Sequence, residues 1–266
     1  LLEAVIAAQL ELVMDWMRVG FIHGVMNTDN TTISGETIDF GPCAMMSAYD
    51  PKAVFSSIDR MGRYAFGNQP AIIAWNMARL AETLVPLLDD DEDRGLERAQ
   101  QCIAGVPERL DDAWHTMMAR KLGLPDGEAE EDRVLTGALL TRMHSEQLDY
   151  TITFDRLTRA LAPDPEPTLL AALEPRWVES WRARLAARGV EPARAREAMR
   201  RQNPVVIPRN HHVEAVIEYT TRTGDPSRAQ ALLEVLRDPY TVGAATAEYQ
   251  DPPEDGDRDY VTFCGT

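Results

Sequence analysis

Helical periodicity is the feature that most restricts the fold of this chain of 266 residues. Near its start, apolar residues recur at three- and four-residue steps from Leu2 through Leu10 to Met17, and charged residues lie off that stripe. This spacing predicts an amphipathic helix that ends at Gly20, since glycine is common just past helix ends. Further helices are expected near 71–88, 92–121, 129–144, 151–162, 167–188, 191–202, 211–222 and 226–237, separated by clusters of Gly, Pro and Asp. The pattern predicts a mainly α protein.

Charge and composition exclude several classes of protein. The chain has 43 acidic and 27 basic residues and a net charge of −16, which argues against binding to nucleic acid or anionic membranes, because both are polyanions. No run of about 18 uncharged apolar residues occurs, so no membrane span is expected. The three cysteines, Cys43, Cys102 and Cys264, are too few for a disulfide framework or a four-ligand zinc site. They suit a reducing compartment, and we expect a cytoplasmic location.

The residues suited to chemistry gather in the stretch 20–42. Residues 31–39, TTISGETID, alternate β-branched and polar residues around a Ser-Gly pair and predict a tight β-hairpin. Asp29 and Asn30 precede this segment and Asp39 ends it, so a hairpin would let their oxygens converge. Carboxylate and amide oxygens are the ligands that Mg²⁺ or Mn²⁺ prefer. A metal site is one interpretation; the other is that these residues only form turns and caps, which is their commonest use.

The order of these residues is similar to the catalytic half of a protein kinase. A helix leads into a loop with His23, then Asn30, then Asp39 in an Asp-Phe-Gly sequence. In kinases, the corresponding asparagine and aspartate hold the metals. Val25 stands where a kinase has its catalytic aspartate, and a valine cannot accept a proton from a hydroxyl group. A conventional protein kinase is therefore disfavoured.

Longer motifs resemble the selenoprotein O family of pseudokinases, in its carboxy-terminal portion. The motifs are HGVMNTDN at 23–30, TIDFGP at 37–42, GRYAFGNQP at 62–70, WNMARLAETL at 75–84, NPVVIPRNHHVEAVIE at 203–218 and FCGT at 263–266. The resemblance implies a protein adenylyltransferase, which transfers AMP from ATP to Ser, Thr or Tyr hydroxyl groups of protein substrates with Mg²⁺ or Mn²⁺. It also implies a bacterial-type cytoplasmic protein whose partners are ATP and those substrates, with neither nucleic acid nor membrane among them.

The resemblance implies a role for each site residue. Asp29 would be the catalytic proton acceptor for the incoming hydroxyl group. Asn30 and Asp39 would bind the metal, and Asp39 would hold the ATP phosphates through it. Cys264 near the end of the chain could form a regulatory disulfide, with Cys43 as the candidate partner; a buried, inert Cys43 is the alternative.

The resemblance also implies the domain organisation. Residues 1–120 would form a kinase-like catalytic C-lobe, residues 121–250 a helical extension and residues 251–266 a C-terminal tail. Within the lobe we expect the catalytic loop at 23–30, the DFG-like segment at 39–41 and an activation-like segment at 42–70. The N-terminal lobe, which grips the ATP phosphates in the family, is expected to be missing from this chain. We therefore expect the chain alone to bind ATP weakly and to transfer nothing.

Some alternatives stay open at this point. Val25 motivates a catalytically inactive pseudokinase scaffold that binds nucleotide or partner proteins. A phosphoryl-transferring kinase would require Asp29 to replace the displaced base. His23 could be a base, although bracing the loop is its usual kinase-like role. The arginine-rich stretch from Arg176 to Arg201 carries interspersed glutamates and is interpreted as a charged exposed face.

Overall fold

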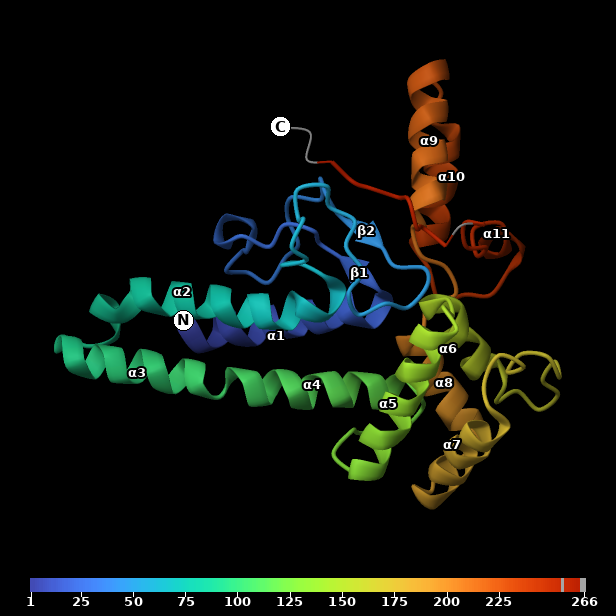
Figure 1. Ribbon diagram of the computed structural model, residues 1–266, viewed down its shortest axis with the longest axis horizontal. Coiled ribbons are helices and arrows are strands. Elements are labelled where there is room, and N and C mark those ends of the chain that lie inside the picture. Colours follow the sequence, from blue (N-terminus) through green and yellow to red (C-terminus); the bar gives the residue numbers. More distant parts are fainter. Residues whose placement is uncertain (255, 264–266) are drawn as a thin grey trace.

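A computed structural model describes residues 1–254 and 256–263, and it is mainly helical, as the sequence predicts (Figure 1). The elements, in chain order, are α1 (Leu2–Val19), β1 (Phe21–Ile22), the 3₁₀ helix η1 (Thr28–Asn30), β2 (Ala44–Met45), the 3₁₀ helix η2 (Phe66–Asn68), α2 (Gln69–Leu88), α3 (Glu92–Ala104), α4 (Val106–Lys121), α5 (Glu130–Ser145), α6 (Tyr150–Arg159), α7 (Pro175–Ala187), α8 (Pro192–Gln202), α9 (Asn210–Thr223), α10 (Ser227–Leu236) and α11 (Ala244–Ala247). In Figure 1, α3 and α4 follow one another along α1 and α2.

Most helix boundaries follow the local signals in the sequence. Helix α1 ends at Gly20, whose φ of 79° is the left-handed conformation that glycine adopts without strain. The single helix expected over 92–121 is divided at Gly105, and Pro107 lies in the first turn of α4. The helix expected over 167–188 begins only at Pro175, because residues 167–172 form turns. A proline at the first helical position is a common way to start a helix.

The β-hairpin predicted at 31–39 is wrong, because residues 31–40 contain no strand. The Thr32 hydroxyl closes a turn instead: it accepts the Glu36 N–H at 2.9 Å and donates to the Glu36 carbonyl at 2.8 Å. Contacts with α1 replace a cross-strand ladder, since Trp16 Nε1 donates to Thr37 Oγ1 at 2.9 Å. Gly35 fits this docking, because a Cβ there would lie 2.8 Å from the Ala8 Cβ.

A small antiparallel sheet is present, but it is formed by the segments that flank the site. Strand β1 pairs with β2, with Phe21 opposite Met45 and Ile22 opposite Ala44. The sheet therefore joins the start of the 20–42 stretch to the residues just after it. The kinase-like arrangement of residues 1–120 stays a prediction.

The expected lobe and the expected extension pack against each other. Buried apolar side chains form one continuous cluster that runs from Leu2 to Met199. Arg18 at the end of α1 donates to the Gln202 carbonyl at 3.0 Å, and Lys121 Nζ donates to the Arg18 carbonyl at 2.7 Å. Burial lowers the pKa of Lys121 well below its ordinary value. These contacts couple the two halves, and the boundary at residue 120 stays a prediction.

One helical stretch, Phe66–Leu88, is long and apolar enough by length and composition alone to cross a membrane. In the structure, α2 packs along α1 and α3 (Figure 1). Gln69 at its start and Asn76 two turns later point buried amide groups at the loop that follows β1. These packed and polar contacts are those of a helix inside a folded domain.

Candidate functional site

Two buried amide side chains on α2 hold the loop 23–30. Gln69 accepts the His23 backbone N–H at 3.0 Å and donates to the Phe21 carbonyl at 2.9 Å. Asn76 donates to the Met26 carbonyl at 3.1 Å and to Thr31 Oγ1 at 2.8 Å. Buried backbone groups that would otherwise lack partners are thereby satisfied. The loop is thus fixed by a helix that lies some 40 to 50 residues away in the chain.

His23 joins this loop to the segment that carries Asp39. Its side chain is 1% exposed, its Nε2 lies 2.8 Å from the Ile38 carbonyl oxygen, and its Nδ1 accepts the Val25 N–H at 3.4 Å. These partners assign the proton of the neutral ring to Nε2. Burial lowers the pKa of His23. With both ring nitrogens engaged, the contacts favour the bracing role over that of a base.

The depressed pKa of His23 predicts a pH-dependent stability. The unfolded chain takes up this proton near pH 6.5, before the folded protein does, so the stabilisation is complete above that pH and is lost as the pH falls further. Urea unfolding measures the free energy of unfolding between pH 7.5 and 5. As the pH falls, this free energy should decline less steeply in His23→Gln than in the original chain, by at most about 1.4 kcal/mol per pH unit. His144→Gln, which changes a half-exposed histidine, is the control. If the free energy of unfolding changed with pH equally in His23→Gln and in the original chain, a lowered pKa of His23 would be contradicted.

Asn30 and the residue before Asp39 are both fastened to the same short stretch, 23–25. Asn30 Nδ2 donates to the Val25 carbonyl at 3.0 Å, and the Ile38 carbonyl bonds to His23. Asp29 lies beside Asn30 in η1, and its side chain is exposed. Asp39 is also exposed and has a φ of 54°, a conformation that aspartate and asparagine adopt more readily than most residues. The three predicted site residues therefore belong to one braced region.

Gly24 permits a close approach between the loop 23–30 and the segment after Asp39. Its φ is +84°, and a Cβ at this position would lie 2.6 Å from the Pro42 carbonyl oxygen. Any other residue type would force the two backbones apart. Beside it, Val25 is buried, so the position of the kinase base contributes an apolar side chain to the interior.

The donors at Asn30 and Asp39 suit a hard divalent cation that keeps water or phosphate ligands. The bond to Val25 uses the Asn30 amide nitrogen and leaves its oxygen available. Asp39 makes no ion pair or side-chain hydrogen bond with any residue that the structure describes. Within residues 1–254 and 256–263, no group of three or more His, Cys, Asp or Glu side chains is placed to hold a metal. Mg²⁺ bound together with a phosphate substrate needs only one or two protein ligands.

The C-terminal segment returns to this region. Thr262 pairs with Ser56 in an isolated bridge, and its hydroxyl donates to the Pro42 carbonyl at 2.7 Å. The neighbouring Cys43 is half-buried, and burial raises the pKa of its thiol. Cys264 lies outside the described residues, so its disulfide with Cys43 stays a prediction.

Residues 203–210, which begin the motif at 203–218, support the site from the far half of the chain. The sequence did not indicate which groups they contact. Asn210 accepts the Met45 N–H and donates to the Met45 carbonyl, both at 2.9 Å, so its amide pairs with β2 as another strand would. Arg209, 1% exposed, donates to Asp149 at 2.8 and 3.3 Å. The local signal is a pair of polar residues, Arg209 and Asn210, that follows the apolar run 205–207 and Pro208.

Comparison with known proteins identifies the family of this chain. A family model described as protein adenylyltransferase SelO matches residues 1–237. Proteins named protein nucleotidyltransferase YdiU are similar to the whole chain: the one from Teredinibacter turnerae is 50% identical over 265 residues, and the one from Anoxybacillus flavithermus is 49% identical over 267. The chain spans about half the length of these relatives, 54% in both cases. With the family model covering most of its length, the chain belongs to the SelO family of protein adenylyltransferases.

Proposed function

We propose that this chain carries the metal-binding and proton-accepting part of a protein adenylyltransferase. The enzyme would transfer AMP from ATP to Ser, Thr or Tyr hydroxyl groups of proteins. The observation that supports it best is the fastening of Asn30 and the Ile38–Asp39 segment to residues 23–25, beside the exposed carboxylate of Asp29. The family description names adenylyl transfer, and the relatives are named nucleotidyltransferases.

The metal-binding role falls to Asn30 and Asp39. Mg²⁺ or Mn²⁺, when bound there, would supply positive charge next to the ATP phosphates. The Asn30 bond to Val25 fixes its amide so that the oxygen can serve as a ligand. The bracing of Ile38 by His23 limits the movement of the neighbouring Asp39. Preorganised ligands of this kind avoid rearrangement during the reaction.

The proton-accepting role falls to Asp29, the one carboxylate within the loop 23–30. It would take the proton of the acceptor hydroxyl as the hydroxyl oxygen bonds to the α-phosphorus of ATP and pyrophosphate leaves. Val25 cannot do this, because its side chain is apolar and buried. An exposed carboxylate next to a metal ligand has the access that a protein substrate requires.

Asp29→Asn in the full-length protein is expected to lower kcat for AMP transfer by about 10²- to 10⁴-fold, the usual contribution of a general base. The KM for ATP should change little, because Asp29 is not assigned to the phosphates. Initial rates of AMP incorporation into protein, measured by mass spectrometry at several ATP concentrations, give both constants. Glu36→Gln, an exposed carboxylate on the next turn, is the matched control and should keep its activity. A kcat for Asp29→Asn within threefold of the original would contradict the proposed base.

A nucleotide-binding scaffold is the second candidate. The burial of the apolar Val25 at the position of the kinase base favours it, because a conventional kinase reaction has no proton acceptor there. This candidate predicts ATP binding without transfer of any part of ATP to protein.

A further inference from the structure

The carbonyl group of Pro42 is a point at which three parts of the chain meet beside the site. From the loop 23–30, Gly24 lies so close that a Cβ there would be 2.6 Å from the Pro42 oxygen. From the far end of the chain, the hydroxyl group of Thr262 donates to the same oxygen at 2.7 Å. Pro42 also lies inside a turn, residues 40–43, which the Cys43 N–H closes on the Phe40 carbonyl at 3.4 Å. This turn directly follows Asp39.

Thr262 is itself held by the backbone on either side of Ser56. Its N–H donates to the Phe55 carbonyl at 2.8 Å, and its carbonyl accepts the Ser57 N–H at 2.9 Å. These two bonds form the parallel bridge with Ser56, and Thr262 is 7% exposed. A buried hydroxyl group needs a partner, and Pro42 supplies it from a backbone that is already ordered.

Tyr260 gives the same segment a second anchorage. Its ring lies against that of Phe55, with the ring centroids 5.9 Å apart, and its hydroxyl group donates to Glu214 of α9 at 3.0 Å. We call residues 260–262 the C-terminal strap, because they join α9 to the loops beside the site. In Figure 1 the red end of the chain runs back from α9 toward the loops around β1 and β2.

Asp39 depends on backbone contacts of this kind for its position. Its carboxylate makes no ion pair or side-chain hydrogen bond with any residue that the structure describes. On one side of it, the Ile38 carbonyl bonds to His23 at 2.8 Å. On the other side, the Pro42 carbonyl bonds to Thr262 at 2.7 Å. The two bonds fix this short segment at both ends.

We propose that Thr262 is a positioning residue, which holds the turn 40–43 against Gly24 and so keeps Asp39 where it binds the metal. This inference rests on the proposed function, because that function assigns the metal to Asn30 and Asp39. Thr262 is assigned no contact with the metal or with ATP; it acts through the Pro42 carbonyl. A ligand that is ordered in advance binds more tightly, because the apparent affinity falls with the fraction of molecules in the binding-competent arrangement.

Two measurements on the full-length protein test the strap and its consequence separately. Hydrogen–deuterium exchange without metal or nucleotide measures how often the turn 40–43 opens. Calorimetry measures the Kd of the Mn²⁺ complex of α,β-methylene-ATP, which cannot transfer AMP. Thr262→Val keeps the shape of the side chain and loses the donor, so exchange in the turn should be about fivefold faster and the Kd about fivefold higher, the usual effect of one hydrogen bond. Thr262→Ser keeps the donor and should stay within about twofold of the original protein in both measurements.

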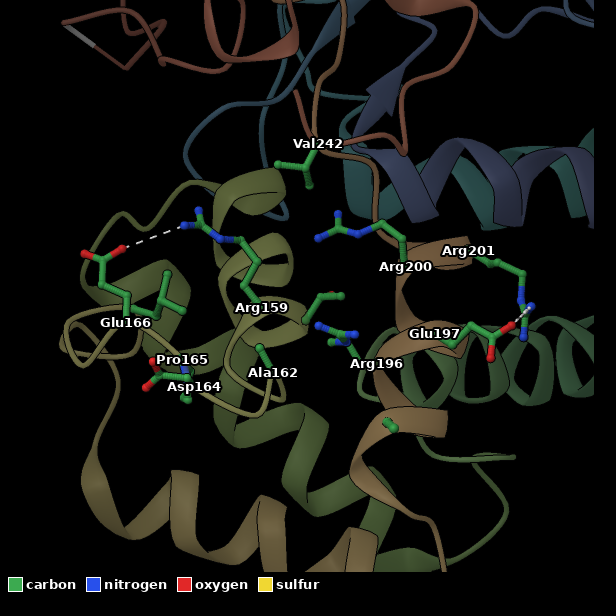
Figure 2. A pocket seen from close by; sticks show the side chains of 13 residues that line it. Arg159, Ala162, Asp164, Pro165, Glu166, Arg196, Glu197, Arg200, Arg201 and Val242 are labelled. Atoms are coloured by element: carbon green, nitrogen blue, oxygen red, sulfur yellow. Dashed lines mark hydrogen bonds and ion pairs between the residues drawn. The ribbon is translucent and has the colours of Figure 1, made fainter. Parts of the chain in front are cut away.

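Thr158→Val is the matched control, because it also removes a buried threonine hydroxyl group. Thr158 is 1% exposed, and its Oγ1 donates to the Phe154 carbonyl at 2.8 Å inside α6. It borders the cavity between α6 and α8 that Figure 2 shows, where Arg201 pairs with Glu197 at 2.9 Å. None of the described residues that line this cavity belongs to the stretch 20–45. Thr158→Val should therefore lower the stability without changing exchange in the turn or the Kd of the Mn²⁺ complex.

Three results would overturn the proposal: unchanged exchange in Thr262→Val, faster exchange with an unchanged Kd, or equal changes in Thr262→Val and Thr158→Val. If Thr262→Val does not fold, Tyr260→Phe decides instead, since it keeps the ring on Phe55 and loses the bond to Glu214. The same directions are expected for it. Asp39→Asn separates this failure from that of the proposed function, because it leaves the Kd unchanged only if Asp39 does not bind the metal.

Discussion

Asp39→Asn is expected to lower AMP transfer by the full-length protein about a thousandfold. A carboxylate that holds a metal against phosphates contributes several kcal/mol to transition-state stabilisation, and each 1.4 kcal/mol is tenfold in rate. Asparagine keeps the shape of the side chain and tolerates the φ of 54° at this position, so the backbone is preserved. The measurement is the rate of AMP incorporation into protein at several Mg²⁺ and Mn²⁺ concentrations.

Asp39→Ala separates the charge from the backbone conformation. Alanine removes the metal ligand and adopts the left-handed conformation less readily than aspartate or asparagine. The activity of Asp39→Ala should therefore be no higher than that of Asp39→Asn, and its free energy of unfolding about 1 kcal/mol lower. Glu36→Gln again serves as the control. Full activity of Asp39→Asn at every metal concentration would rule out the assignment of Asp39.

Asp149→Ala is expected to destabilise the chain by about 3–5 kcal/mol. The substitution leaves the guanidinium of Arg209, bonded to Asp149 at 2.8 Å, buried without its counter-charge. Asp149 also accepts the Ile152 N–H at 2.7 Å at the start of α6, so part of the loss is a helix cap. Urea unfolding gives the total.

Asp91→Ala measures the cap alone. Asp91 accepts the Arg94 N–H at the start of α3 at 3.1 Å, and we expect about 1 kcal/mol for its loss. Asp149→Asn retains an acceptor for the helix cap and loses only the charge. It should therefore lower the free energy of unfolding clearly more than Asp91→Ala does. If Asp149→Ala costs no more than Asp91→Ala, the buried pair does not stabilise the fold.

Local patterns in the sequence were sufficient for most of the helices, although not for every boundary. The stripe from Leu2 to Met17 predicts α1, and Gly20 predicts its end, because both signals act within a few residues. The prediction of a hairpin at 31–39 was wrong because the conformation of this segment depends on contacts beyond the local pattern. Its alternating pattern is compatible with a strand, but the side chains of Trp16 and Thr32 satisfy the polar groups of this segment in another way.

The site residues themselves lie within one continuous motif, so their type and spacing were readable. Their supports were not, because Gln69 and Asn76 come from a later helix and Asn210 is 165 residues from Met45. A polar amide on the buried face of an apolar helix was the available signal for Gln69 and Asn76. Which backbone groups they satisfy depends on the tertiary fold.

The most direct test of the central claim follows the phosphates of ATP. The full-length protein is incubated with Mg²⁺ or Mn²⁺ and ATP labelled at either the α- or the γ-phosphate, and modified proteins are then weighed by mass spectrometry. The proposed function predicts label from the α-position and a mass increase of one AMP. Label from the γ-position alone would mean a kinase, and binding of ATP with no label on protein would mean a scaffold; either result would contradict adenylyl transfer.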